Sequence, residues 1–203
     1  MHDEELTLAD KRAHSSAPLH PLIAERWSPR ALDPDAEVTD TQLRSLLEAA
    51  RWAASYGDTQ PARYLVGRRG DDTFRRIHGV LVPGNQSWAH AAAVLMLGVA
   101  VTRNEKGDIP YAEYGVGLAT QNLVLQAVAE GLVGHQMAGF DPAAAAAEFR
   151  LPSWARPLIV VAIGGLGDPS LLIERRRARE VAPRTRLGLG EIAFSGEWGT
   201  PLF

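Results

Sequence analysis

Apolar residues along this chain recur with two different periods, which predicts a mixture of helices and buried strands. Over residues 43–50 they lie three and four positions apart, so we expect an amphipathic helix that ends near residue 53. Thr39 and Gln42 have the spacing of a capping box at its start. The apolar run 94–101 has the length of a fully buried strand, and we prefer that interpretation to a helix.

The remaining elements follow from shorter signals. Residues 116–130 are almost free of charge and precede Gly131, which predicts a largely buried helix with a glycine just beyond its end. Asp141 and Pro142 have the side chains of an N-cap and a first helical residue, so we expect a short helix to about residue 150. Further predictions are strands over 64–66 and 158–163, a helix over 71–78 and a turn at Pro83-Gly84-Asn85. Helices mixed with a few buried strands indicate an α+β or α/β fold.

The ends of the chain differ from its middle. Residues 1–20 show mixed charge and no clean period, so we interpret them as a flexible lead-in to a domain over 21–203. From about residue 168 to 203 the chain is polar and rich in arginine, which predicts an extended arm along the domain or across a partner subunit. The run 175–179 favours a solvated helix face or a linker over a phosphate contact.

Composition excludes several classes of protein. The chain has 203 residues and no cysteine, so a disulfide framework, a thiolate nucleophile and a Cys-ligated metal are excluded. A net charge of -3 argues against a general nucleic-acid binder. The longest apolar run, 91–101, is too short to span a membrane, and the acidic N-terminus lacks the apolar segment of a secretion signal. We therefore expect a soluble cytoplasmic protein.

Several common catalytic signatures are absent from the sequence. Neither lysine, Lys11 or Lys106, follows a glycine, which excludes a P-loop. Gly115 and Gly117 lack the third glycine of a dinucleotide-binding fingerprint, and there is no Gly-x-Ser-x-Gly elbow. The 6 histidines show no metal-binding spacing, so we expect no metal site.

Two short arginine-containing segments are the best candidates for anion binding. Arg26, Ser28 and Arg30 alternate, so in an extended segment they would share one face and offer two guanidinium groups and a hydroxyl to a phosphate. Arg184 and Arg186 repeat this spacing near the other end. Spacing alone favours an ordinary charged loop, and a shared phosphate would require the two ends of the chain to converge.

The order of motifs from about residue 21 to the C-terminus resembles the nitroreductase family of FMN-dependent oxidoreductases. Any one of these motifs is weak, but they agree with the family in order and spacing. They are Arg26-Trp27-Ser28-Pro29-Arg30, the segment 53–64, Asn85 before a buried strand, Gln121-Asn122, the segment 135–141, and Arg184-Thr185-Arg186 followed by Glu191-Ile192 and Trp198-Gly199.

The resemblance implies an α+β sandwich with a central mixed or antiparallel sheet flanked by helices. It also implies an intertwined homodimer with FMN at the interface and NADPH or NADH as electron donor. The small electron-poor acceptor would be a nitroaromatic or a quinone, reduced by a ping-pong mechanism. The flavin does the redox chemistry, so no catalytic side chain and no metal are expected.

The same resemblance assigns roles to individual residues. Arg26, Ser28, Arg184 and Arg186 would hold the phosphate, and Arg30 the N1–C2=O edge of the flavin. Ser55, Asp58 and Gln60 would meet the ribityl chain or the pyrimidine rim, and Asn85 the pyrimidine edge. The segment 136–139 would pass beside the ring, with the N–H of Ala138 or Gly139 near N5. The full cofactor-binding set is Arg26, Trp27, Ser28, Arg30, Ser55, Asp58, Gln60, Asn85, Gln136, Met137, Ala138, Gly139, Arg184 and Arg186.

Four residues depart from the family pattern and keep other functions open. Ala54 stands for a proline, Tyr56 for a serine, Asp58 for an asparagine and Ala62 for a tryptophan. An ionised Asp58 near reduced flavin would lower its potential, and Ala62 would either open space or lose a packing contact. The alternatives are a flavin-binding or sequestering protein without nicotinamide turnover, and an enzyme of the same fold that reduces an enone or uses a deazaflavin partner.

Overall fold

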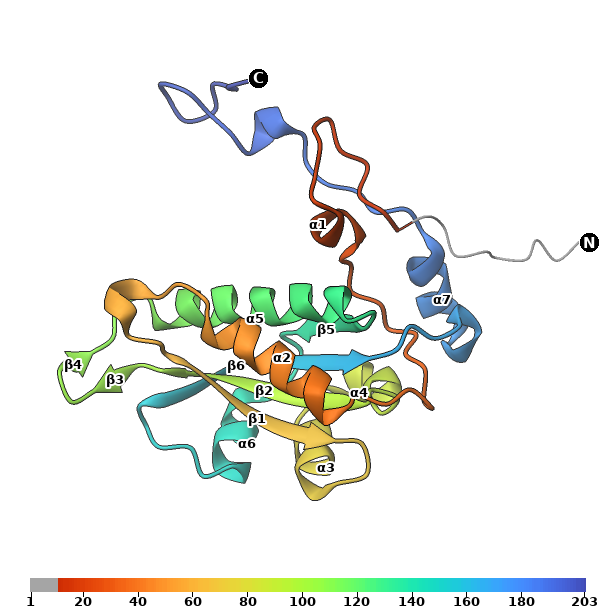
Figure 1. Ribbon diagram of the computed structural model, residues 1–203, viewed down its shortest axis with the longest axis vertical. Coiled ribbons are helices and arrows are strands. Elements are labelled where there is room, and N and C mark those ends of the chain that lie inside the picture. The colour runs from red at the N-terminus through yellow and green to blue at the C-terminus, as the bar shows by residue number, and fades with distance from the viewer. Residues whose placement is uncertain (1–10) are drawn as a thin grey trace, which may run out of the picture.

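The computed structural model describes residues 11–203 and places four strands in one antiparallel sheet (Figure 1). These strands are β1 (Ala62–Arg68), β2 (Val94–Val101), β6 (Ala155–Gly164) and β5 (Val133–Met137), in the order β1-β2-β6-β5. The pairs β1–β2, β2–β6 and β5–β6 are all antiparallel. A second, two-stranded sheet joins β3 (Arg103–Asn104) to β4 (Gly107–Asp108). The α+β sandwich and its antiparallel central sheet are thus confirmed.

Helices cover both faces of the sheet. On one face lie α2 (Asp40–Arg51) and α5 (Ala112–Ala129), and on the other α3 (Asp72–Gly79), α4 (Pro83–Ala89) and α6 (Pro142–Glu148) (Figure 1). Strand β2 shows why both faces need cover: Val94 and Met96 pack toward α2 and α5, while Leu95 and Leu97 pack toward α3 and α4. Since successive side chains of a strand point to opposite faces, an unbroken apolar run requires a layer on each side.

The remaining helices lie outside these two layers. They are α1 (Pro21–Glu25), α7 (Glu174–Val181) and three short 3₁₀ helices at Tyr56–Asp58, Pro169–Leu171 and Leu189–Glu191. The helix α7 thus interrupts the C-terminal segment, and the chain beyond it runs out past α1 (Figure 1). Within the described residues 11–203, no helix has the length and apolar character needed to cross a bilayer.

Most of the elements predicted from periodicity are confirmed. Strand β2 has the predicted bounds, the Thr39–Gln42 capping box is formed, and Asp141 caps α6. The predicted turn at Pro83-Gly84-Asn85 is wrong, because these residues open α4 with the proline at its first position. A proline lacks only an N–H that has no helical partner there, so Pro-Gly can start a helix as well as make a turn. Residues 1–10 of the predicted lead-in lie outside the described residues.

Candidate functional site

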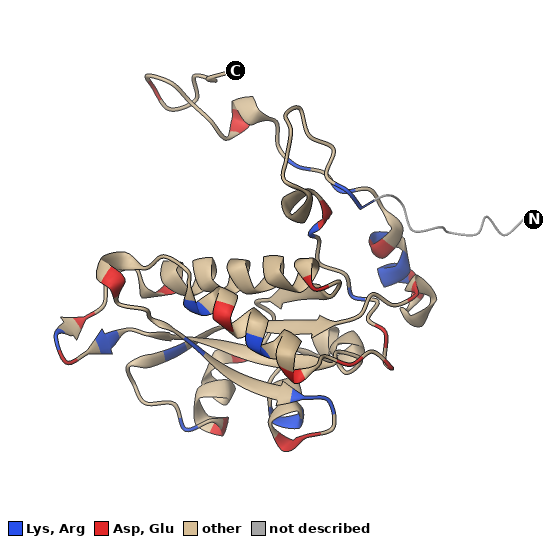
Figure 2. Ribbon diagram, in the orientation of Figure 1, with Lys and Arg blue, Asp and Glu red and all other residues tan. Residues whose placement is uncertain are grey.

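A cationic cavity forms where the two ends of the described chain run side by side. Its volume is about 200 Å³, and it lies between the segment 26–30 and the residues that follow α7. Figure 2 shows lysine and arginine gathered on α7 and on the adjoining terminal segments. The lining residues include Lys11, Arg26, Trp27, Ser28, Arg30, Arg179, Glu180, Arg184 and Arg186. The structure therefore brings together the two arginine pairs that the sequence places at opposite ends.

Positive charge in this cavity exceeds its negative charge. Six of its lining side chains are cationic, and Glu180 is the one carboxylate among the described residues that line it. The pKa of Arg26 is lowered by burial and by the nearby charges of Arg184 and Arg186. Mutually repelling guanidinium groups are stabilised by an anion placed between them. Arg26 Nη1 also donates to Ser28 Oγ at 3.2 Å, which holds both side chains on the cavity wall.

The two C-terminal arginines differ in their surroundings. Arg184 Nη1 donates to the carbonyl oxygens of Lys11 and Ala24, at 2.6 and 3.0 Å, so it also joins the N-terminal segment to α1. Arg186 is exposed, and its Nη1 donates to the carbonyl of its neighbour Thr185, at 2.7 Å. Arg186 is therefore freer than Arg184 to turn toward a bound anion.

Two buried side chains that the sequence analysis did not single out hold the backbone of the segment 26–31. His135 Nδ1 lies 2.8 Å from the carbonyl oxygen of Pro29 and, as its N–H tautomer, donates to it. Glu180 Oε1 accepts from the backbone N–H groups of Arg30 and Ala31. These contacts join residues 106 to 150 positions apart, so no local pattern could have revealed them.

Lys11 is a third residue of the cavity that the motifs did not indicate. Its side chain is buried, its Nζ donates to the carbonyl oxygen of Ala182, and it lies 5.0 Å from the centroid of the Trp27 ring. Burial lowers the pKa of Lys11, the nearby Glu180 raises it, and Arg184 lowers it further. Lys11 therefore fastens the N-terminal segment onto the cavity.

The residues predicted to pass beside a flavin ring form a second part of the site. Gln136 and Met137 end β5, followed by Ala138 and Gly139, and Asn85 Nδ2 donates to the carbonyl of Gly139 at 2.9 Å. A Cβ atom on Gly139 would lie only 2.6 Å from that amide nitrogen, so a larger residue here would displace the Asn85 side chain. Gln136 Nε2 donates to Gln121 Oε1 at 3.2 Å, which ties the strand to α5. Through His135, this strand is also joined to the cationic segment.

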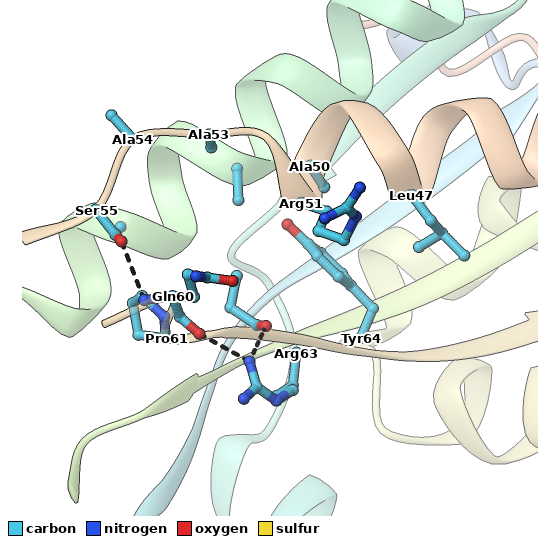
Figure 3. A pocket seen from close by; sticks show the side chains of 13 residues that line it. Leu47, Ala50, Arg51, Ala53, Ala54, Ser55, Gln60, Pro61, Arg63 and Tyr64 are labelled. Atoms are coloured by element: carbon cyan, nitrogen blue, oxygen red, sulfur yellow. Dashed lines mark hydrogen bonds between the residues drawn. The ribbon is translucent and has the colours of Figure 1, made fainter. Parts of the chain in front are cut away.

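Of the predicted loop residues, Ser55 and Gln60 line a different pocket, and Asp58 contacts Gln60. This pocket of about 120 Å³ lies between α2, the loop and β1, and Figure 3 shows Ser55 Oγ accepting from the backbone N–H of Gln60. Asp58 Oδ1 accepts from Gln60 Nε2 at 3.0 Å. Ala62 is among the residues that line this pocket.

The loop backbone is strained. Gly57, Asp58 and Gln60 have φ angles of 52°, 53° and 46°, and two of these residues are not glycine. Left-handed conformations of non-glycine residues cost free energy and persist where the surrounding structure or a function requires them. The strain marks the loop as a candidate binding element.

The loop and the cationic cavity lie near opposite ends of α5. Pro61, which follows the loop, contacts Gly115 in the first turn of this helix, whereas α1 and β5 lie near its other end (Figure 1). A helix of 18 residues spans about 27 Å. One chain therefore brings the arginine cluster, Asn85 and the end of β5 together, and leaves Ser55, Asp58 and Gln60 apart from them.

A metal site in this chain would be built from acidic and histidine side chains. Among residues 11–203, no group of three or more His, Asp or Glu side chains is arranged to hold a metal ion. The cationic cavity is thus the feature of the described chain whose chemistry points most directly to a ligand, because its surplus of guanidinium groups suits an anion.

Known proteins resemble this chain in sequence. The model of the nitroreductase family matches residues 23–81 and 81–165. A 15.4 kDa uncharacterized protein of Mycolicibacterium smegmatis is 43% identical over 148 residues, which are 69% of this chain and 99% of that protein. A Streptomyces coelicolor protein, whose name assigns it to the NADH dehydrogenase/NAD(P)H nitroreductases, is 30% identical over 66% of this chain and 77% of its own.

Solved structures extend the similarity to almost the whole chain. The crystal structure of an oxidoreductase containing FMN superposes with a TM-score of 0.85 at 30% identity, over 91% of this chain and 95% of the other. A nitroreductase family protein from Clostridium difficile 630 has a TM-score of 0.68 at 22% identity, over 87% and 96% of the two chains. The second likeness concerns the fold alone.

Proposed function

The chain belongs to the nitroreductase family, and we propose that it is an FMN-dependent oxidoreductase that takes electrons from NADH or NADPH. The observation that carries the proposal is the cavity in which Arg26, Arg184 and Arg186 converge, where Glu180 is the single carboxylate that the described residues contribute to the lining. A phosphate monoester dianion fits such a surplus of guanidinium groups. The relative with a TM-score of 0.85 contains FMN, which supports the same cofactor here.

Each part of the site has a role in holding the cofactor. Arg26, Ser28, Arg184 and Arg186 would bind the phosphate. Arg30, whose backbone is fixed by Glu180, would place its charge near the N1–C2=O edge, where a cation favours the reduced anionic ring. The Asn85–Gly139 contact holds the chain after β5 in place, so that the backbone N–H of Ala138 or Gly139 can face the ring edge.

When bound, FMN supplies hydride acceptance at N5 and electron transfer to a second substrate. The protein residues orient the donor and the acceptor and shield the ring from water. Since FMN would be the one redox group held by the residues of the proposed site, donor and acceptor would bind there in turn, which corresponds to a ping-pong mechanism. Small electron-poor compounds, such as nitroaromatics or quinones, are the acceptors we propose.

A homodimer would complete the site. Ser55, Asp58 and Gln60 lie away from the arginine cluster of their own chain, so we propose that the loop of a second copy supplies them. The arm beyond α7 supports this assembly, because it leaves large apolar side chains in solvent: Trp198 is 92% exposed and Phe203 is 81% exposed. Large apolar side chains gathered on one projecting segment favour burial against a partner.

The first experiment is the absorption spectrum of the purified protein, before and after anaerobic addition of NADPH and then NADH. We expect a flavin spectrum that bleaches, and the faster donor identifies the nicotinamide preference. A flavin spectrum that neither donor bleaches would instead favour a flavin-binding or sequestering protein, or an enzyme with a different electron donor. Protein that neither carries flavin nor takes up added FMN would contradict the proposed function.

Replacing Asp58 with asparagine should raise the midpoint potential of the bound flavin by roughly 20–40 mV. The exchange preserves the shape of the side chain and an oxygen that can accept from Gln60 Nε2, but removes a negative charge that opposes electron uptake. The potential is measured by anaerobic dye titration. Asp35→Asn, at an exposed turn, is the matched control and should leave the potential unchanged. An unchanged potential in Asp58→Asn would show that Asp58 does not tune the flavin.

A further inference from the structure

Glu180 is a buried carboxylate whose position needs a physical reason. The side chain lies in the last turn of α7 and is only 1% exposed. Burying a carboxylate is costly unless hydrogen bonds compensate for the lost water. Glu180 Oε1 accepts from the backbone N–H of Arg30 at 2.7 Å and from that of Ala31 at 2.9 Å. The compensation therefore comes from the segment that carries the first arginine pair.

The same segment is held from its other side. His135, on β5, contacts the carbonyl oxygen of Pro29, the residue just before Arg30. Three consecutive backbone groups, from Pro29 to Ala31, are thus fixed by two side chains distant in sequence. A backbone fixed in this way keeps Arg26, Ser28 and Arg30 on the wall of the cavity before any anion arrives. Such preorganisation lowers the entropy cost of binding.

The charge of Glu180 argues against a direct role in anion binding. A carboxylate in the wall of a phosphate site repels the phosphate, so charge alone would favour its absence. The N–H group of Ala31, however, belongs to a residue only 1% exposed, and a buried donor without an acceptor is strongly unfavourable. We therefore attribute the role of Glu180 to the hydrogen bonds that it accepts from these two N–H groups, and not to its charge.

We propose that Glu180 is a positioning residue for the cofactor phosphate. Its side chain is long enough to accept hydrogen bonds from the backbone N–H groups of Arg30 and Ala31, and these bonds hold the phosphate-binding side chains in place. The proposal rests on the proposed function of the cavity. It concerns a residue beyond positions 23–165, to which the family model is matched. In the sequence, α7 is conspicuous only for its arginines. The proposal gives this helix a second role, because its Glu180 fixes the backbone of the segment that carries Arg26, Ser28 and Arg30.

Two substitutions distinguish the effect of side-chain length from the effect of charge. Glu180→Gln keeps the length and an accepting oxygen without the charge, whereas Glu180→Asp keeps the charge and is one methylene too short. The full-length chain, stripped of bound flavin, is titrated with FMN and with riboflavin, which lacks the phosphate. We expect Glu180→Gln to bind FMN within about threefold of the unmodified chain, and Glu180→Asp to bind it about tenfold more weakly. Riboflavin binding should change less than about threefold in both variants.

Glu174 offers a matched control on the same helix, because it is exposed in the first turn. Glu174→Gln and Glu174→Asp should leave both affinities unchanged. If Glu180→Asp does not fold, Glu180→Met, which fills similar space without an accepting oxygen, takes its place with the same expectation. Thermal unfolding of every variant is recorded alongside.

Other results would overturn the proposal. If Glu180→Gln loses FMN as strongly as Glu180→Asp, the length of the side chain is not sufficient and its charge is needed as well. If FMN and riboflavin weaken equally, Glu180 supports the fold and does not position the phosphate segment. If the unmodified chain takes up no FMN, the proposed function fails first. In that case inorganic phosphate is the probe for the role of Glu180. Phosphate should raise the unfolding temperature of the unmodified chain and of Glu180→Gln. An equal rise in Glu180→Asp would refute the role proposed for Glu180.

Discussion

Replacing Arg26 with alanine is expected to weaken FMN binding about a hundredfold, the equivalent of about 3 kcal/mol for a lost charge-assisted contact. Arg26 is half-buried, its pKa is lowered by burial and by Arg184 and Arg186, and it donates to Ser28 on the cavity wall. Its guanidinium is thus held in place where a phosphate would sit, and no carboxylate among residues 11–203 forms an ion pair with it. Fluorescence quenching of added FMN measures the affinity.

The control for this variant is Arg44→Ala, which removes an exposed arginine from α2 and should leave the affinity unchanged. Riboflavin provides a second control, because without a phosphate its affinity should fall far less than that of FMN. If Arg26→Ala binds FMN as tightly as the unmodified chain does, the cavity is not the phosphate site.

The proposed dimer gives the same variant a second use. Gln60→Ala alters the strained loop, and in a dimer with shared sites this loop serves the arginine cluster of the other copy. A mixed dimer of Arg26→Ala and Gln60→Ala would then carry both changes in one site and neither in the other. FMN binding should return in part when the two variants are unfolded and refolded together. If no binding returns, each site is built from a single chain.

The sequence predicted those parts of the fold that depend on local chemistry. The strand at 94–101 follows from an unbroken apolar run, and the helix at 142–148 from the Asp-Pro pair that starts it. Strand β5 was not predicted, because Gly134, His135 and Gln136 give it no apolar alternation. It forms because β6 offers an edge to pair with and α5 covers one side.

The site shows the same division between local and distant causes. The alternation of Arg26, Ser28 and Arg30 is visible in the sequence, and the structure places their side chains on one cavity. The convergence with Arg184 and Arg186 depends on how α7 packs, and no sequence spacing contains that information. The sequence could not identify His135 and Glu180 as the residues that fix the backbone of the segment 26–31. A single histidine or glutamate carries no sign of such a role until its hydrogen-bond partner is known.

The stability of the protein should fall by about 3 kcal/mol as the pH is lowered from 7 to 4, through His135 alone. Burial lowers the pKa of His135 from 6.5 to about 4, because the charged ring would lose its water and lie near Arg30 and Arg26. Between these two values the unfolded chain binds a proton that the folded chain does not. Stability is therefore full above pH 6.5, falls as the pH drops below it, and levels off near pH 4.

Urea unfolding of the unmodified chain and of His135→Asn at several pH values tests this expectation. Asparagine can still offer an N–H to the carbonyl of Pro29, but it does not titrate. We therefore expect the variant to have a lower free energy of unfolding at pH 7 and to lose less of it when the pH is lowered. The difference in unfolding free energy between the two proteins should shrink by about 3 kcal/mol from pH 7 to pH 4, while carboxylates common to both cancel. His90→Gln, at an exposed position, should retain the full acid sensitivity. Parallel curves for the unmodified chain and His135→Asn would mean that the buried imidazole is not the group that senses acid. The contact of His135 with the carbonyl oxygen of Pro29 would then have no part in the pH dependence of stability.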